Sequence, residues 1–195
     1  MIHNLITFSG ARGSGKDTMI SELIPIYSTE DLNRMIPCTT RDIRDGEIDG
    51  VHQHFMSEDK FILEEKRGKF IFTNPKNASG YCSGTLKSEL CHKFGVIDIT
   101  ASGAKKLRDY VFQNGGRALS FMLYADYDTR YERVRSRQKG ISNEELDLMM
   151  NNDPTDPDPE SHPYWFVRVE NKDGHFNEAL SRVEMTIKEF LAASN

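Results

Sequence analysis

Residues 10–16 read Gly-Ala-Arg-Gly-Ser-Gly-Lys, and no other feature constrains the fold of this chain as strongly. A β-prone run, Leu5-Ile6-Thr7-Phe8, precedes them, and a stretch with helical spacing follows from Asp17 to about Ile26. A G-x-x-x-x-G-K run between a strand and a helix forms a loop whose backbone N–H groups surround phosphate oxygens. The predicted phosphate-binding residues are Gly10, Ala11, Arg12, Gly13, Ser14, Gly15, Lys16, Asp17 and Thr18.

Asp17 stands where such loops usually carry a Ser or Thr whose hydroxyl contacts Mg²⁺. A carboxylate is itself a hard oxygen ligand that suits Mg²⁺, so Asp17 is a candidate metal ligand. In the alternative interpretation, Asp17 caps the helix and Thr18 supplies the hydroxyl. We favour the metal-related role, which makes Mg²⁺ an expected cofactor.

Further strand-to-helix units make the chain an α/β protein. Residues 96–99 and 119–124 are β-prone, and helical patterns follow at 101–112 and 126–137. This alternation predicts a mainly parallel sheet flanked by helices. The remaining expectations are a late strand at 166–169, a closing helix at 177–191, a loop at the proline-rich 151–163, and an inserted subdomain at about 37–92 with one helix near 57–66.

The bulk composition narrows the class of partner. A chain of 195 residues with 37% hydrophobic content suits one compact domain. Its 25 basic and 30 acidic residues give a formal charge of -5, which favours a free nucleotide over nucleic acid as the partner. The three cysteines form no C-x-x-C pair, and no apolar run approaches the roughly 18 residues of a membrane span. We therefore expect a cytoplasmic protein without disulfides, zinc or a membrane partner; the oligomeric state stays open.

Residues 38–55 read Cys-Thr-Thr-Arg-Asp-Ile-Arg-Asp-Gly-Glu-Ile-Asp-Gly-Val-His-Gln-His-Phe. This segment resembles the T-T-R-x-x-R-x-G-E-x-x-G-x-x-Y-x-F segment of guanylate kinases, and the similarity extends to the phosphate loop, to Gly84-Thr85 and to residues 96–99. The resemblance implies a three-layer P-loop α/β fold around a five-stranded, mainly parallel sheet. It also implies a single guanylate-kinase-like domain over 1–195, with a core at 1–36 and 93–195, an acceptor-binding subdomain at about 37–92 and a lid at about 133–160.

The same resemblance implies Mg²⁺-dependent transfer of the ATP γ-phosphoryl group to an acceptor that already carries a phosphate. Arg41 and Arg44 match the two arginines that grip the acceptor's monophosphate, a role that suits planar guanidinium groups. Asp98 matches an aspartate near the phosphates and the metal. Arg133 and Arg137 best match the arginines that clamp the transferring phosphates. The expected catalytic residues are Lys16, Arg41, Arg133 and Arg137.

Each of these assignments has a structural alternative. The two arginines near residue 41 can be surface residues that pair with Asp42, Asp45 or Glu47. Asp98 can be a strand-end aspartate whose carboxylate binds backbone donors. The basic helix can be an ordinary solvated face.

The chain departs from the family pattern where the acceptor's base is read. Gln53 replaces a tyrosine, Cys82-Ser83 replace paired tyrosines, and Phe72 falls where the family uses a glutamate to accept protons from guanine. A phenyl ring accepts no such hydrogen bonds, so guanine specificity is in question, and Phe72 either lines the acceptor site or belongs to the core. The expected acceptor-binding residues are Arg41, Arg44, Gln53, Phe72, Ser83, Thr85 and Asp98.

Three functions fit these features. The first is a nucleoside monophosphate kinase that uses GMP, dGMP or another NMP or dNMP. The second is a kinase for a non-guanine acceptor such as a dNMP or ribose bisphosphate, because the Gly-Lys-Asp form of the loop also looks like phage-type deoxynucleoside monophosphate kinases and ribose bisphosphate phosphokinases. The third is a non-catalytic guanylate-kinase-like binding module, which the changed base pocket favours and the intact loop at 10–16 disfavours.

Overall fold

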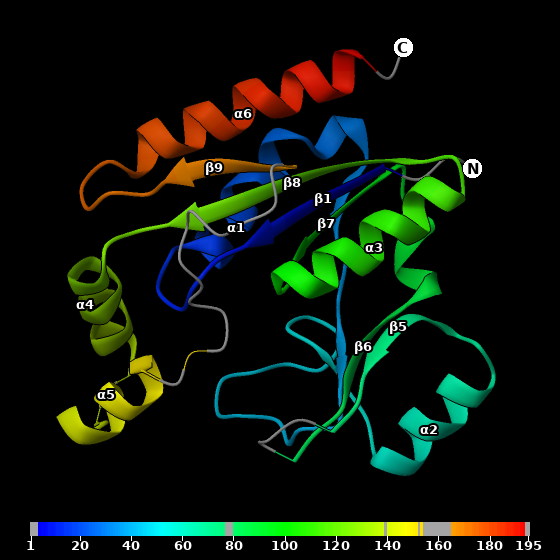
Figure 1. Cartoon of the computed structure of the whole chain (residues 1–195), viewed down its shortest axis with the longest axis horizontal. Coiled ribbons are helices and arrows are strands. Elements are labelled where there is room, and N and C mark those ends of the chain that lie inside the picture. The colour runs from blue at the N-terminus through cyan, green and yellow to red at the C-terminus, as the bar shows by residue number, and fades with distance from the viewer. Residues whose placement is uncertain (1–3, 77–79, 139, 152, 154–164, 194–195) are drawn as a thin grey trace. The chain divides into compact units, whose positions relative to one another are not determined.

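A computed structural model describes residues 4–76, 80–138, 140–151, 153 and 165–193 (Figure 1). Its five-stranded sheet has the order β2-β7-β1-β8-β9, and the registers of the outer pairs β2–β7 and β8–β9 are parallel. The prediction of a P-loop α/β fold with a mainly parallel sheet is therefore confirmed. By internal contacts the chain divides into two compact units. The first comprises Met1–Leu5, Tyr27–Ile97 and Lys105–Ala118, and the second comprises Ile6–Ile26, Asp98–Ala104 and Leu119–Asn195.

The second unit carries the phosphate loop and most of the helices. Its elements, some of which begin in the first unit, are β1 (Asn4–Ser9), α1 (Lys16–Ile26), β8 (Arg117–Tyr124), α4 (Tyr127–Arg137), α5 (Asn143–Asn151), β9 (Phe166–Glu170) and α6 (Phe176–Ala192). Within its core, the rings of Phe8 and Phe121 stack with centroids 5.0 Å apart. Every residue of β1 is buried, as expected for a central strand of a parallel sheet. The strand that leads into the loop is thus held firmly in the core.

The closing helix α6 packs through one apolar stripe. Ala179, Val183 and Ile187 are spaced by four residues and are buried, and α6 contacts β9 (Figure 1). The helix predicted at 177–191 is confirmed with boundaries one residue wider at each end.

Helix α5 was not expected from the sequence. Its start carries a capping box, because the Ser142 hydroxyl accepts from Glu145 N at 3.2 Å while the Glu145 carboxylate accepts from Ser142 N at 3.0 Å. Leu146 and Met150 then pack against Val134 of α4 in a small apolar cluster. The loop expected at 151–163 lies almost wholly outside the described residues, and so do residues 154–160 of the expected lid.

The first unit contains the region expected to form an inserted subdomain. Its elements are β2 (Leu32–Arg34), β3 (Cys38–Thr39), β4 (His54–Phe55), α2 (Glu58–Lys66), β5 (Phe70–Asn74), β6 (Ser83–Leu86), β7 (Phe94–Asp98) and most of α3 (Ala101–Gln113). A second sheet of order β4-β3-β6-β5 encloses a small core with α2, made by Cys38, Phe61 and Phe70. Burial in that core raises the pKa of the Cys38 thiol to about 12.

No helix within the described ranges is both long enough and apolar enough to cross a bilayer.

Candidate active site

The phosphate loop between β1 and α1 has a backbone that only glycine tolerates at two positions. Gly13 and Gly15 have φ of 81° and 95°, in the left-handed region. A Cβ on Gly13 would lie 2.6 Å from Arg130 O, and a Cβ on Gly15 would lie 2.4 Å from Asn171 Nδ2. These close approaches let α4 and the β9–α6 connection line the loop directly.

Lys16, the first residue of α1, folds back over the loop. Its ammonium donates to Gly10 O at 2.9 Å and to Ala11 O at 3.2 Å. Carbonyl partners hold the charge beside the loop while leaving an ammonium hydrogen for a further acceptor. This position suits a lysine that contacts donor phosphates.

Two arginines of α4 bind the loop from outside. The Arg130 side chain is 5% exposed and donates to Arg12 O at 3.4 Å. Arg133 donates to Gly13 O at 3.4 Å and to Asn171 O at 3.2 Å. The solvated-face alternative is therefore wrong for these two arginines, since both side chains bind the loop.

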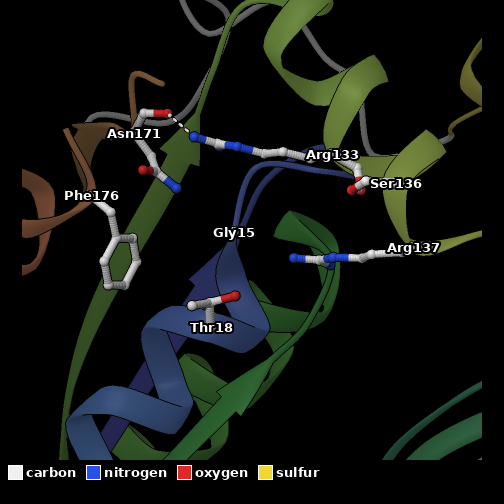
Figure 2. A pocket seen from close by; sticks show the side chains of 7 residues that line it. All are labelled: Gly15, Thr18, Arg133, Ser136, Arg137, Asn171 and Phe176. Carbon is white, nitrogen blue, oxygen red and sulfur yellow. Dashed lines mark hydrogen bonds between the residues drawn. The ribbon is translucent and has the colours of Figure 1, made fainter. Parts of the chain in front are cut away.

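A cavity of about 280 Å³ opens between these elements (Figure 2). It brings together four residues expected to bind nucleotide, namely Gly15, Thr18, Arg133 and Arg137. Its other lining residues, Ser136, Asn171 and Phe176, were missed by sequence reasoning. A weak signal existed for Asn171, because it directly follows the late strand and so lies at the carboxyl edge of the parallel sheet, where α/β proteins bind ligands.

Asn171 is held in one orientation in this cavity. Its Nδ2 donates to Ser14 O at 2.8 Å, and its own N–H donates to Tyr124 O at 2.8 Å. The residue is 1% exposed, and its Oδ1 has no hydrogen-bond partner among the described residues. A buried unpaired acceptor costs about 1–3 kcal/mol, so a ligand N–H donor at this point would be favoured.

Asp153 reaches the loop from the segment after α5. Its carboxylate accepts a hydrogen bond from Arg12 N at 2.5 Å. The carboxylate therefore occupies one of the backbone donors that the sequence predicts to face phosphate oxygens.

The two expected metal ligands lie in the second unit. Asp17 is exposed in the first turn of α1, next to the loop lysine, and Asp98 is half-buried as the last residue of β7. No group of three or more metal-ligating side chains occurs among the residues described. The donor set still fits Mg²⁺, which usually takes one or two carboxylates and completes its shell with phosphate oxygens and water.

On the acceptor side, in the first unit, Arg41 is bound by Glu47. Two guanidinium nitrogens donate to the two carboxylate oxygens, each at 2.8 Å. This pairing lowers the pKa of Glu47 to about 2 and raises the pKa of Arg41. The structural alternative predicted for Arg41 is thus present, yet the guanidinium keeps further N–H donors and is fixed in place.

The other acceptor-side residues have different surroundings. Arg44 is exposed, and its backbone N–H donates to Glu47 Oε2 at 2.8 Å. Gln53 is half-buried, and its backbone carbonyl oxygen accepts a hydrogen bond from Gly50 N. Phe72 pairs with Thr85 across β5 and β6 and is half-buried, outside the small core that holds Phe70. Phe72 thus does not belong to the small core that holds Phe70.

Comparison with known proteins agrees with this geometry. The chain matches the guanylate kinase of Histophilus somni with 34% identity over 110 residues, covering 54% of this chain and 53% of that enzyme. It matches the guanylate kinase of Chlorobium luteolum with 28% identity over 152 residues, covering 76% and 75%. The chain thus aligns with about half the length of the first relative and three quarters of the second.

Solved structures show the same fold. A guanylate kinase from Anaplasma phagocytophilum superimposes with a TM-score of 0.59 at 15% identity, over 96% of this chain and 86% of that one. A gluconokinase from Sinorhizobium meliloti gives a TM-score of 0.52 at 16% identity, over 100% of this chain and 99% of that one. The family model described as guanylate kinase matches residues 2–189. Together with the phosphate loop and its cavity, this match shows that the chain belongs to the guanylate kinase family, a family of nucleoside monophosphate kinases.

Proposed function

We propose that this protein transfers the γ-phosphoryl group of ATP to a nucleoside monophosphate, with GMP and dGMP as the first acceptors to test. One observation carries the proposal: Gly15 of the phosphate loop, Arg133 and Arg137 of α4 and the buried Asn171 line a single cavity. The family relationship supports the reaction class. The relatives named above give no support to a ribose bisphosphate acceptor or a non-catalytic binding module.

The donor nucleotide fits the cavity by its chemistry. The free Oδ1 of Asn171 suits the amino group of adenine, and it would repel the carbonyl oxygen that guanine carries at the same ring position. Phe176 adds an aromatic ring to the lining (Figure 2). Lys16, Arg133 and Arg137 supply the positive charge that a triphosphate requires.

Asp17 and Asp98 would hold Mg²⁺, with Thr18 as a nearby hydroxyl. The ion would neutralise charge on the transferring phosphate and orient it. The protein's own residues then need to hold the two substrates in line and exclude water, which accounts for most catalysis in this reaction class.

Arg41 and Arg44 would bind the acceptor's phosphate. A phosphate oxygen of the acceptor attacks the γ-phosphorus of ATP, the bond to the β-phosphate oxygen breaks, and ADP leaves with that electron pair. Because the attacking group is already an anion, the step needs no general base.

The test is ADP formation from ATP with Mg²⁺ and a panel of acceptors: GMP, dGMP, the other NMPs and dNMPs, and ribose bisphosphate. The proposal expects Lys16-dependent turnover, and Lys16→Ala is the control. Turnover of ribose bisphosphate alone would establish a different kinase. ATP binding without turnover of any acceptor would point to a binding module.

A further inference from the structure

Four side chains share the face of the β5–β6 pair that points away from the small core. Phe72 lies opposite Thr85, and Asn74 lies opposite Ser83, in an antiparallel register. The register shifts between Phe70 and Phe72, as in a β-bulge. Because side chains alternate along a strand, this extra residue moves Phe72 to the face opposite Phe70. We name Phe72, Asn74, Ser83 and Thr85 the base platform.

Lys106 of α3 reaches the base platform with its ammonium group. Nζ lies 5.2 Å from the centroid of the Phe72 ring and donates to Asn74 Oδ1 at 3.1 Å. Asn74 Nδ2 in turn donates to Ser83 Oγ at 3.3 Å. The amide is thereby fixed, with its oxygen facing the lysine and its nitrogen facing the serine.

The groups that remain for a ligand are the ammonium, which can only donate, and two hydroxyls, which can donate or accept. An ammonium with one hydrogen in use keeps two more, and the Ser83 hydroxyl accepts from Asn74 and so has its hydrogen to give. Thr85 is 1% exposed, and its Oγ1 has no partner among the described residues. Neither a carboxylate nor another acceptor-only group belongs to the base platform. An aromatic surface beside an ammonium that can only donate is complementary to a ring that presents a carbonyl oxygen to that ammonium.

We propose that Lys106 determines the specificity for the acceptor's base by donating to a carbonyl oxygen, so that the acceptor is a nucleoside monophosphate with a keto base. Guanine, hypoxanthine and uracil carry such an oxygen, whereas adenine and cytosine present an amino group at the corresponding position. An amino group there meets the Lys106 ammonium, which cannot accept, and leaves both donors unpaired, so adenine and cytosine are disfavoured. The proposal rests on the proposed function, because it assumes that the base platform faces the acceptor.

GMP and IMP share the keto oxygen that Lys106 would bind and differ in the 2-amino group, which the ammonium cannot read because it has no acceptor. GMP and IMP should therefore be used with similar efficiency, within about tenfold, as expected when an unread substituent differs. Both should exceed AMP by about 100-fold, because the amino group of adenine leaves the ammonium hydrogens of Lys106 unpaired.

The test compares kcat/KM and Kd for GMP, IMP, UMP, AMP and CMP in the wild type and in Lys106→Met. Methionine keeps an apolar stem over Phe72 but removes the ammonium. The preference for keto over amino bases should fall at least about tenfold, the equivalent of one charged hydrogen bond. The matched control is Lys105→Met, because Lys105 precedes Lys106 on α3 and pairs with Asp109 at 2.7 Å. This control should keep the wild-type preference.

The proposed kinase activity and the inferred role of Lys106 can fail independently of each other. If ATP turnover is absent with all five acceptors while the Kd values still favour keto bases through Lys106, the proposed function fails and the specificity inference stands. If turnover occurs but AMP and CMP match GMP, or if Lys106→Met leaves the preference unchanged, the specificity inference is overturned and the kinase activity stands.

Discussion

In the phosphate-loop region, two buried polar atoms, Ser14 Oγ and Asn171 Oδ1, have no hydrogen-bond partner among the described residues. In the Arg41 region, by contrast, the guanidinium is already bound through two nitrogens to Glu47. Each buried unpaired group costs about 1–3 kcal/mol, which a ligand that satisfies it restores. The comparison suggests that the loop region gains strongly from its ligand, whereas the arginine region is ordered beforehand by its own contacts.

The largest expected effect is the loss of the loop lysine. Lys16→Ala removes the ammonium held over Gly10 O and Ala11 O, so turnover should fall by about 1000-fold, in the range found for a charged group that stabilises transferring phosphate. Steady-state ADP formation measures this change. A loss below tenfold would break the assignment of this loop as the donor site.

The Arg133→Ala variant tests whether Arg133 clamps the transferring phosphates or is an ordinary surface arginine. Arg133→Ala should lower kcat by about 100-fold, because the side chain lines the cavity and binds two loop-side carbonyls. The matched control is Arg135→Ala, since Arg135 is 55% exposed and lies 3.7 Å from Glu132 on the same helix. Equal losses in the two variants would mean that only the charge of α4 matters.

Asn171 should select the donor base. Asn171→Ala removes the unpaired Oδ1, so the preference for ATP over GTP, measured as a ratio of kcat/KM, should fall by about tenfold. The exposed Asn177 of α6 offers Asn177→Ala as a control that keeps the ratio. An unchanged ratio in Asn171→Ala would show that the adenine amino group lies elsewhere.

Weakening the Arg41–Glu47 pair should change the KM for the acceptor and leave the KM for ATP unchanged. Glu47→Gln weakens the contact that orients Arg41, so the KM for the acceptor should rise about fivefold, equivalent to roughly 1 kcal/mol for a partly exposed pair.

The pKa of Glu47 falls from 4.5 to about 2 on folding, so the pair stabilises the fold above pH 4.5, and this stability is lost as the pH falls towards 2. The free energy of unfolding, measured between pH 2 and 7, should therefore differ least between the wild type and Glu47→Gln at the acidic end.

The smallest expected effect concerns Asp153, whose carboxylate competes with phosphate for Arg12 N. Asp153→Ala should tighten ATP binding two- to fivefold, since a charge at a helix N-terminus contributes about 0.3–1 kcal/mol. Calorimetric titration with a non-hydrolysable ATP analogue measures the change, and Asp128→Ala removes an exposed charge of α4 as a control. Weaker binding in Asp153→Ala would instead make this carboxylate part of the nucleotide site.

Local signals predicted the loop and the strand-to-helix units. The glycine run and the apolar spacing act over a few residues, so β1, α1, β8, α4 and α6 follow the expectations closely. Helix α5 was missed although Ser142 and Glu145 form a capping box, because the helix is short and the apolar residues that hold it pack against α4. Asn171 and Lys106 were missed because their partners are distant in sequence: Ser14 for the first, and Phe72 and Asn74 for the second.

The most direct test of the contrast between the two regions is a grid of initial rates over ATP and GMP concentrations for Asn171→Ala and Arg44→Ala. Arg44 is exposed on the acceptor side, and Asn171 is buried beside the loop. We expect Arg44→Ala to raise the KM for GMP by about tenfold, as the loss of a charged phosphate contact would, and to change the KM for ATP less than twofold. Asn171→Ala should do the reverse. A rise in the KM for ATP alone in Arg44→Ala would contradict the assignment of donor and acceptor to these two regions.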